Sequence, residues 1–170
     1  MAELDLQTTG YTFESPNLEL EIFRLVTTLA ASEKLAEMAK TEPDGRKWEW
    51  LKKSEFPEIC RILLSIASIV RNNIDSDSNL SEYDAFKVNR PVGLIVTDLS
   101  TPTKKDPLNL REACNKIIHA TRVNPDVCDV NQGMNSALTP FVYLYGDHRG
   151  KEWCALINVF EFAASAMEFV

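Results

Sequence analysis

Apolar residues recur every three or four positions along the first long stretch of the chain, which is typical of a helix that buries one face. Ser15 and Pro16 stand just before this pattern and supply an N-cap and a proline suited to the first helical turn. The pattern therefore predicts a helix over 16–40. The apolar positions that carry it are Leu18, Ile22, Leu25, Leu29 and Ala36.

A second stretch is apolar around almost its whole circumference. It predicts a helix over 56–74 that contains the segment ILLSIASIV and lies at the centre of a bundle. This apolar segment is too short to cross a bilayer, so we expect no membrane association. A third helix is predicted over 107–121, where Pro107 suits the first turn, and a closing helix over 160–170.

Between and after these helices lie segments with β-prone residues. VGLIV at 92–96 is a candidate short strand, and PFVYLYG and KEWCALINV are joined by the turn DHRG, which predicts a hairpin over 140–159. The polar segments at 72–84 and 124–140 are rich in Asn, Asp and Ser, so we expect them to be irregular.

The predicted fold is therefore mainly α, with a bundle of three to four main helices and a C-terminal β-hairpin. The whole chain, 1–170, forms a single domain, as its length suggests. Residues 1–15 are a lead-in, 16–122 the bundle core, 140–159 the hairpin and 160–170 the closing helix.

Composition narrows the compartment and the partners. The net charge of −7 disfavours nucleic acid and anionic membranes as partners of the molecule as a whole. The four cysteines form no CxxC pair, and the N-terminal MAELDLQTTG lacks the basic start and apolar run of a secretion signal, so we expect a cytoplasmic protein. With two histidines and scattered cysteines, neither a metal site nor a bound cofactor is expected.

One segment departs from the acidic character of the chain. Between residues 104 and 122 five basic residues and two acidic ones give a net charge of +3, so the rest of the chain carries −10. If this segment binds an anionic polymer such as RNA, its cations would contact the phosphates. The RNA-binding residues expected in that case are Lys104, Lys105, Lys116 and Arg122, and the fifth basic residue of the segment is Arg111.

The same segment contains LREACNKIIHA at 110–120. On a helix, Arg111, Asn115 and His119 are spaced four apart and form one row beside the apolar face. Histidine is suited to proton transfer near neutral pH, and arginine stabilises charge on a phosphate. The row is a candidate site for acid–base chemistry on a phosphate, and it is equally typical of the solvated face of an amphipathic helix.

LREACNKIIHA, following a long helix and a polar loop, resembles the small helical HEPN-type domains of prokaryotes. Those domains are helical bundles, often dimeric, and many are metal-independent endoribonucleases of toxin and phage-defence systems. Their signature is an Arg, usually followed by a polar residue, then four to six residues and a His. The resemblance implies a homodimer in which His119 is the acid–base residue and Asn115 its polar partner; Arg111 would stabilise the phosphate charge, and Arg71 is a possible support.

Two other functions stay open. Seven residues separate Arg111 from His119, more than that signature allows, which favours a non-catalytic, antitoxin-like, accessory or inhibitory module that binds a basic protein through its acidic surface. A sensor that holds a small molecule between bundle and hairpin is the third alternative. His148, with Asp147 and Arg149 in the hairpin turn, is interpreted as part of a solvated turn.

Overall fold

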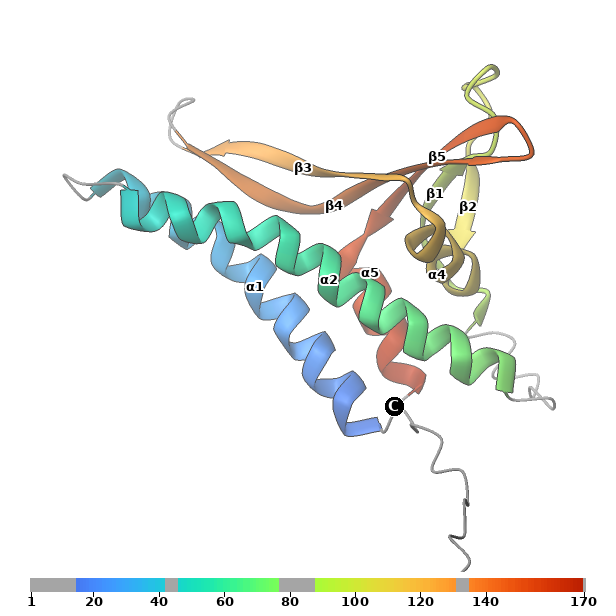
Figure 1. Ribbon diagram of the computed structural model, residues 1–170, viewed down its shortest axis with the longest axis horizontal. Helices are drawn as coiled ribbons and strands as arrows, with labels where there is room; N and C mark the ends of the chain where they lie inside the picture. The colour runs from blue at the N-terminus through green and yellow to red at the C-terminus, as the bar shows by residue number, and fades with distance from the viewer. Residues whose placement is uncertain (1–14, 42–45, 77–87, 131–134, 170) are drawn as a thin grey trace, which may run out of the picture.

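The computed structural model describes residues 15–41, 46–76, 88–130 and 135–169. Two long helices precede a sheet that is interrupted by one short helix, and a last helix follows the sheet (Figure 1). The elements are α1 (Ser15–Thr41), α2 (Arg46–Ser76), β1 (Pro91–Val96), β2 (Asp106–Asn109), α4 (Leu110–His119), β3 (Arg122–Val130), β4 (Asn135–His148), β5 (Lys151–Asn158), α5 (Val159–Ala166) and a 3-10 turn, η1 (Met167–Phe169).

The five strands form one antiparallel sheet in the order β2-β1-β5-β4-β3. Figure 1 shows all four described helices on one side of this sheet. Side chains alternate along β5, so that Trp153, Ala155 and Ile157 are buried under the helices while Cys154 and Leu156 face the other side. The molecule is thus a two-layer α+β structure with one covered and one open sheet face.

The prediction of a helical bundle with a single C-terminal hairpin is wrong. The segment at 124–140, expected to be irregular, supplies most of β3 and the first part of β4, and residues 106–109 form β2 instead of the first turn of a helix. Pro, Asn and Asp are poor strand formers, but the edge of a sheet accepts them, and β2 and β3 are the two edge strands.

Several individual elements are confirmed. The helix predicted over 16–40 is α1, the strand predicted over 92–96 is β1, and the hairpin predicted over 140–159 is β4 and β5, of which β4 begins earlier. The helix predicted over 56–74 is only the second part of α2, which continues through Pro57 although proline cannot donate a helical hydrogen bond. Residues 1–14 and 77–87 lie outside the described part of the chain.

The core lies between the helical layer and the covered sheet face. From the helices, Leu18, Leu25, Ile62 and Ile66 are completely buried, as the helical periodicity of α1 and α2 predicts. The sheet and α5 contribute the other half, so the core is shared by both layers. These partners are Val142, Leu144, Ala155, Ile157 and Phe162.

One polar group is buried where the far end of the β3–β4 hairpin rests on the helices. The Ser32 hydroxyl donates to Glu55 Oε2 at 3.0 Å and accepts the Leu138 N–H at 2.9 Å, while Lys52 Nζ donates to the Ser136 carbonyl. Burial raises the pKa of the Glu55 carboxyl, and its Oε1 has no hydrogen-bond partner among the described residues. The folded state therefore binds a proton here more tightly than the unfolded chain does.

A Glu55→Gln variant tests this point. A raised folded-state pKa means that the stability gained from the proton is present at low pH and lost as the pH rises through that pKa. The amide carbonyl of the substituted side chain keeps the acceptor for Ser32 without a charge, so the variant's Tm at pH 7 should exceed that of the wild type by about 2–4 °C. The difference in Tm between the variant and the wild type should become smaller toward pH 4, as measured by circular dichroism.

Glu58→Gln is the matched control on the same helix. Arg61 lowers the pKa of Glu58 by a hydrogen bond, so removal of this charge should leave the Tm at pH 7 unchanged or lower it. If Glu55→Gln and Glu58→Gln changed the Tm at pH 7 in the same direction, the burial argument would be wrong.

Candidate functional site

Helix α4 carries the polar row that the sequence singled out. Asn109 caps its N-terminus and accepts the Glu112 N–H at 2.8 Å. The apolar side of α4 packs in the core, which fixes the orientation of the helix. As a result Asn115, Lys116 and His119 lie on the side turned away from α2. The buried residues of α4 are Leu110, Ala113, Cys114 and Ile117.

A pocket of about 930 Å³ lies between this polar side of α4 and the end of the β4–β5 hairpin. Both histidines of the chain line it, one from the helix and the other from the last position of β4. Its lining is almost entirely polar or charged: Thr97, Asp98, Glu112, Asn115, Lys116, His119, Asp147, His148, Lys151 and Trp153.

Strand pairing explains how the hairpin reaches the pocket. His148 is paired with Lys151 and Gly146 with Trp153, so these four residues share the helix-facing side of the sheet. Trp153 is buried and lies flat on Gly146, where a Cβ would come within 2.3 Å of the indole ring. Lys116 Nζ lies 4.4 Å from the centre of the same ring, so Trp153 holds a cation at the base of the pocket.

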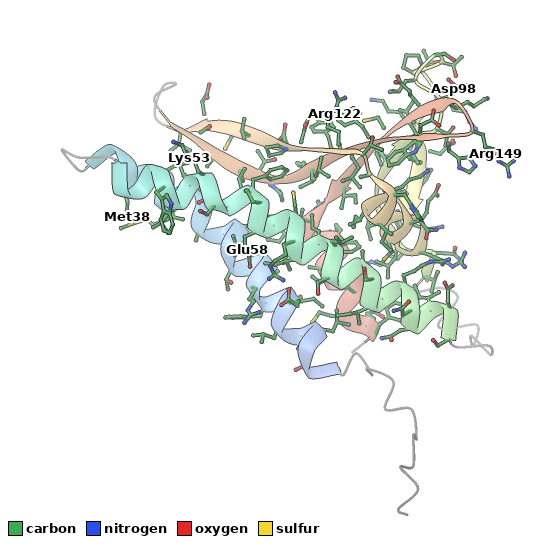
Figure 2. All side chains as sticks on the ribbon, in the orientation of Figure 1. Met38, Lys53, Glu58, Asp98, Arg122 and Arg149 are labelled. Carbon is green, nitrogen blue, oxygen red and sulfur yellow. The ribbon has the colours of Figure 1, made fainter. Side chains whose placement is uncertain are left out.

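A charged pair forms the opposite wall. Lys151 Nζ lies 3.2 Å from Asp98 Oδ2, and Ser100 donates hydrogen bonds from its hydroxyl and its N–H to Asp98 Oδ1. The hydrogen bonds from Ser100, aided by Lys151, lower the pKa of Asp98. Figure 2 places Asp98 next to the hairpin turn that contains Arg149. This carboxylate is therefore fixed and ionised near neutral pH.

The structure separates the predicted row. Asn115 and His119 line the pocket, but Arg111 lies outside it, with its Nη2 2.9 Å from Asp75 Oδ1. Arg71, the possible support, binds the other oxygen of Asp75 through its Nη2 at 2.9 Å. Asp75 therefore holds both guanidinium groups beside α4, away from His119.

The predicted RNA-binding cations are also dispersed. Lys116 is in the pocket, whereas Lys104 pairs with Asp106 and Lys105 is exposed in the loop before β2. The Arg122 guanidinium lies 4.1 Å from the centre of the Tyr145 ring, on the sheet face turned away from α1 and α2 (Figure 2). A net charge of +3 along the sequence therefore does not produce one basic surface.

Sequence reasoning missed the hairpin half of the pocket. The local sequence around His148 is that of a solvated turn, and no motif marks Asp98, Lys151 or Trp153. The sequence does hold one indication of this half of the pocket, because alternation along the predicted hairpin puts His148, Lys151 and Trp153 on one face of the sheet. The position of α4 against that face was not available, since it depends on the sheet order.

Cys114 is excluded as a nucleophile of this site. It lies on the buried side of α4, and burial raises the pKa of its thiol to about 12. The reactive form of a cysteine is the thiolate, which is scarce at neutral pH when the pKa is this high. The groups able to transfer protons in the pocket are instead its imidazoles, ammonium groups and carboxylates.

Comparison of the chain with models of protein families, with curated proteins and with solved structures gives no significant match. In the described part of the chain, no group of three or more His, Cys, Asp or Glu side chains is placed to hold a metal ion. Within the same residues, no helix is long and apolar enough to cross a membrane.

Gly146→Ala should disrupt the pocket from below. The added Cβ would overlap the indole of Trp153, which is confined by the core, so we expect a loss of about 1–3 kcal/mol in stability. A change in the near-ultraviolet circular dichroism would report the displaced ring. Gly150→Asn is the control, because a Cβ there meets no atom and Asn tolerates its positive φ of 78°. If both variants matched the wild type, the ring would not rest on Gly146 in solution.

Proposed function

We propose that the pocket between α4 and the β4–β5 hairpin cleaves RNA by acid–base catalysis without a metal ion. The observation that carries this proposal is the convergence of both histidines, together with Lys116, on one polar pocket. Cleavage of a phosphodiester next to a 2′-hydroxyl needs one group to remove a proton and another to supply one, and two imidazoles provide this pair.

The reaction balances without a further reactant. One imidazole removes the proton of the 2′-hydroxyl, whose oxygen attacks the adjacent phosphorus and forms a 2′,3′-cyclic phosphate. The bond from phosphorus to the 5′-oxygen breaks, and the other imidazolium, His119 or His148, gives its proton to that leaving oxygen. The Lys116 ammonium stabilises the negative charge that develops on the phosphoryl oxygens.

The charges of the pocket lining leave room for one phosphate of the RNA. Of the three carboxylates in the lining, Asp98 is paired with Lys151, and Asp147 accepts the Gly150 N–H at 3.0 Å. Glu112 is the third carboxylate of the lining. The proposal keeps the reaction that the HEPN resemblance implies, and it keeps His119 and Asn115 in the site. Lys116 takes the place of Arg111 in stabilising the phosphate charge, and His148 is added as the second proton-transfer group.

The first experiment compares single-histidine variants on fluorescently labelled single-stranded RNA in EDTA. His119→Ala and His148→Ala should each lower kcat by roughly 10²- to 10⁴-fold, the usual contribution of a general acid or base. Lys105→Ala and Arg149→Asn, which change charges outside the pocket lining, should retain activity. The product should carry a 2′,3′-cyclic phosphate, and a 2′-deoxy substitution at the cleaved position should block the reaction.

Two results would reject this function: intact RNA after incubation with the folded wild-type protein, or equal cleavage by the wild type and the His119→Ala variant. A normal Tm and circular dichroism spectrum for each variant would exclude unfolding as the cause of a loss.

The pH dependence tests the pairing of the histidines. Because one imidazole must be neutral and the other protonated, kcat/KM of the wild type should describe a bell-shaped curve. Residual activity of His119→Ala and of His148→Ala should each lack one limb of the bell, and the two variants should lack opposite limbs. Loss of the same limb in both variants would contradict the assignment of one acid and one base.

A second function, binding of a basic protein without catalysis, is favoured by the outward face of α1. Phe23 and Leu20 are 64% and 45% exposed there, on a chain whose net charge is −7. Exposed apolar side chains are typical of protein contacts, and a net negative charge favours a basic partner. A partner retained by the wild type at low salt, released at high salt and lost with Phe23→Ser would support this function. Retention by Phe23→Ser would argue against it.

A further inference from the structure

The sheet face opposite the helices is apolar and aromatic along its centre. Two rows of paired residues cross it, and within the described chain no helix covers them. Of their eight residues only Arg122 is charged. One row is Leu94, Leu156, Tyr143 and Asn124, and the other is Val96, Cys154, Tyr145 and Arg122.

The aromatic residues of this face lie side by side. Tyr143 and Tyr145 are two residues apart on β4 and therefore point to the same side, about 7 Å from each other along the strand. The Arg122 guanidinium lies over the Tyr145 ring, 4.1 Å from its centre, so the outer plane of the guanidinium is the flat surface that this pair offers to a base. Rings and guanidinium planes in this arrangement are typical platforms for unpaired bases.

The platform adjoins the proposed catalytic pocket. A hollow of about 250 Å³ is lined by residues of both sheet faces, among them Arg122 and Tyr145 of the platform and also Asp147 and Trp153, which line the two-histidine pocket as well. Arg122 and Tyr145 are the first pair between β3 and β4, so beyond them β4 has no β3 neighbour. A nucleic-acid strand bound to Tyr143, Tyr145 and Arg122 can therefore pass this free edge of β4 to reach the histidines.

Edge-to-edge assembly is a less suitable use of this sheet. The two edge strands β2 and β3 carry Pro107 and Pro125, and each ladder contains a shift of register. Prolines and bulges are the features by which edge strands avoid pairing with another chain. The open face, not the edges, is therefore the side of the sheet that is suited to a ligand.

From these observations we infer that the open face binds single-stranded RNA by stacking two bases, one on Tyr143 and one on the Tyr145–Arg122 pair, and that the strand continues to the pocket. This inference rests on the proposed function and specifies its substrate as unpaired RNA. Bases inside a duplex stack on one another and do not expose their faces. Arg122 is the one cation of the two rows, so the platform itself adds at most one phosphate contact, and its share of the salt-dependence slope is about −0.7 or less.

The test measures binding without cleavage. A fluorescein-labelled single-stranded 2′-O-methyl oligonucleotide, which has no free 2′-hydroxyl, is titrated with the protein, and anisotropy gives Kd. Tyr143→Ala and Tyr145→Ala should each weaken binding roughly 5- to 150-fold. Tyr145→Phe, which keeps the ring, should bind like the wild type. Phe23→Ala, which removes a more exposed aromatic ring from α1, is the matched control and should change nothing.

The outcomes separate this inference from the proposed function. His119→Ala/His148→Ala should bind the oligonucleotide like the wild type although it cleaves no RNA. Equal binding by the wild type and both Tyr→Ala variants would overturn the platform, even if RNA cleavage were intact. Equal affinity for a duplex, or no binding by the wild type, would also overturn it, as would a wild-type dimer that Tyr143→Ala converts to a monomer.

Discussion

The backbone pairing between β1 and β5 joins the β1–β2 hairpin, which precedes α4, to the β4–β5 hairpin. It joins residues about sixty positions apart and places β5 at the centre of the sheet, with β1 on one side and β4 on the other. The approach is close at Gly93, where a Cβ would lie 2.1 Å from the Leu156 carbonyl oxygen. Only a residue without a side chain allows the two strands to meet here.

The candidate site is a consequence of that pairing. Helix α4 follows the β1–β2 hairpin directly, and its apolar side is packed in the core, so its position is set by β1. The hairpin that carries His148 is set by β5. Because β1 and β5 are neighbours, His119 and His148 meet across one pocket although neither belongs to a motif with the other.

The sequence was informative where a signal is local. Periodicity predicted α1 and the second part of α2, and turn residues predicted the β4–β5 hairpin. The row on α4 directed attention to His119 and Asn115, which do line the pocket. Arg111 was placed on the same row by spacing alone, and its pairing with Asp75 depends on α2 packing beside α4.

The remainder depends on contacts between distant segments. β3 contains Asn124, Pro125 and Asp126, whose local preference is for a turn, and pairing with β4 makes this segment a strand. The same limitation concealed His148, because a charged turn looks solvated until another element is placed against it. The fold class was wrong for this reason, since a strand order cannot be derived from periodicity.

The central place of β5 also affects the synthesis of the protein. β5 forms hydrogen bonds with β1 on one side and with β4 on the other. Until residue 158 has left the ribosome, β1 and β4 therefore lack the strand that joins them. A nascent chain that ends earlier contains the residues of α1, α2 and α4 but has neither the complete pocket nor the continuous sheet. Any activity of the site therefore arises only after the ribosome has moved well past the histidines themselves.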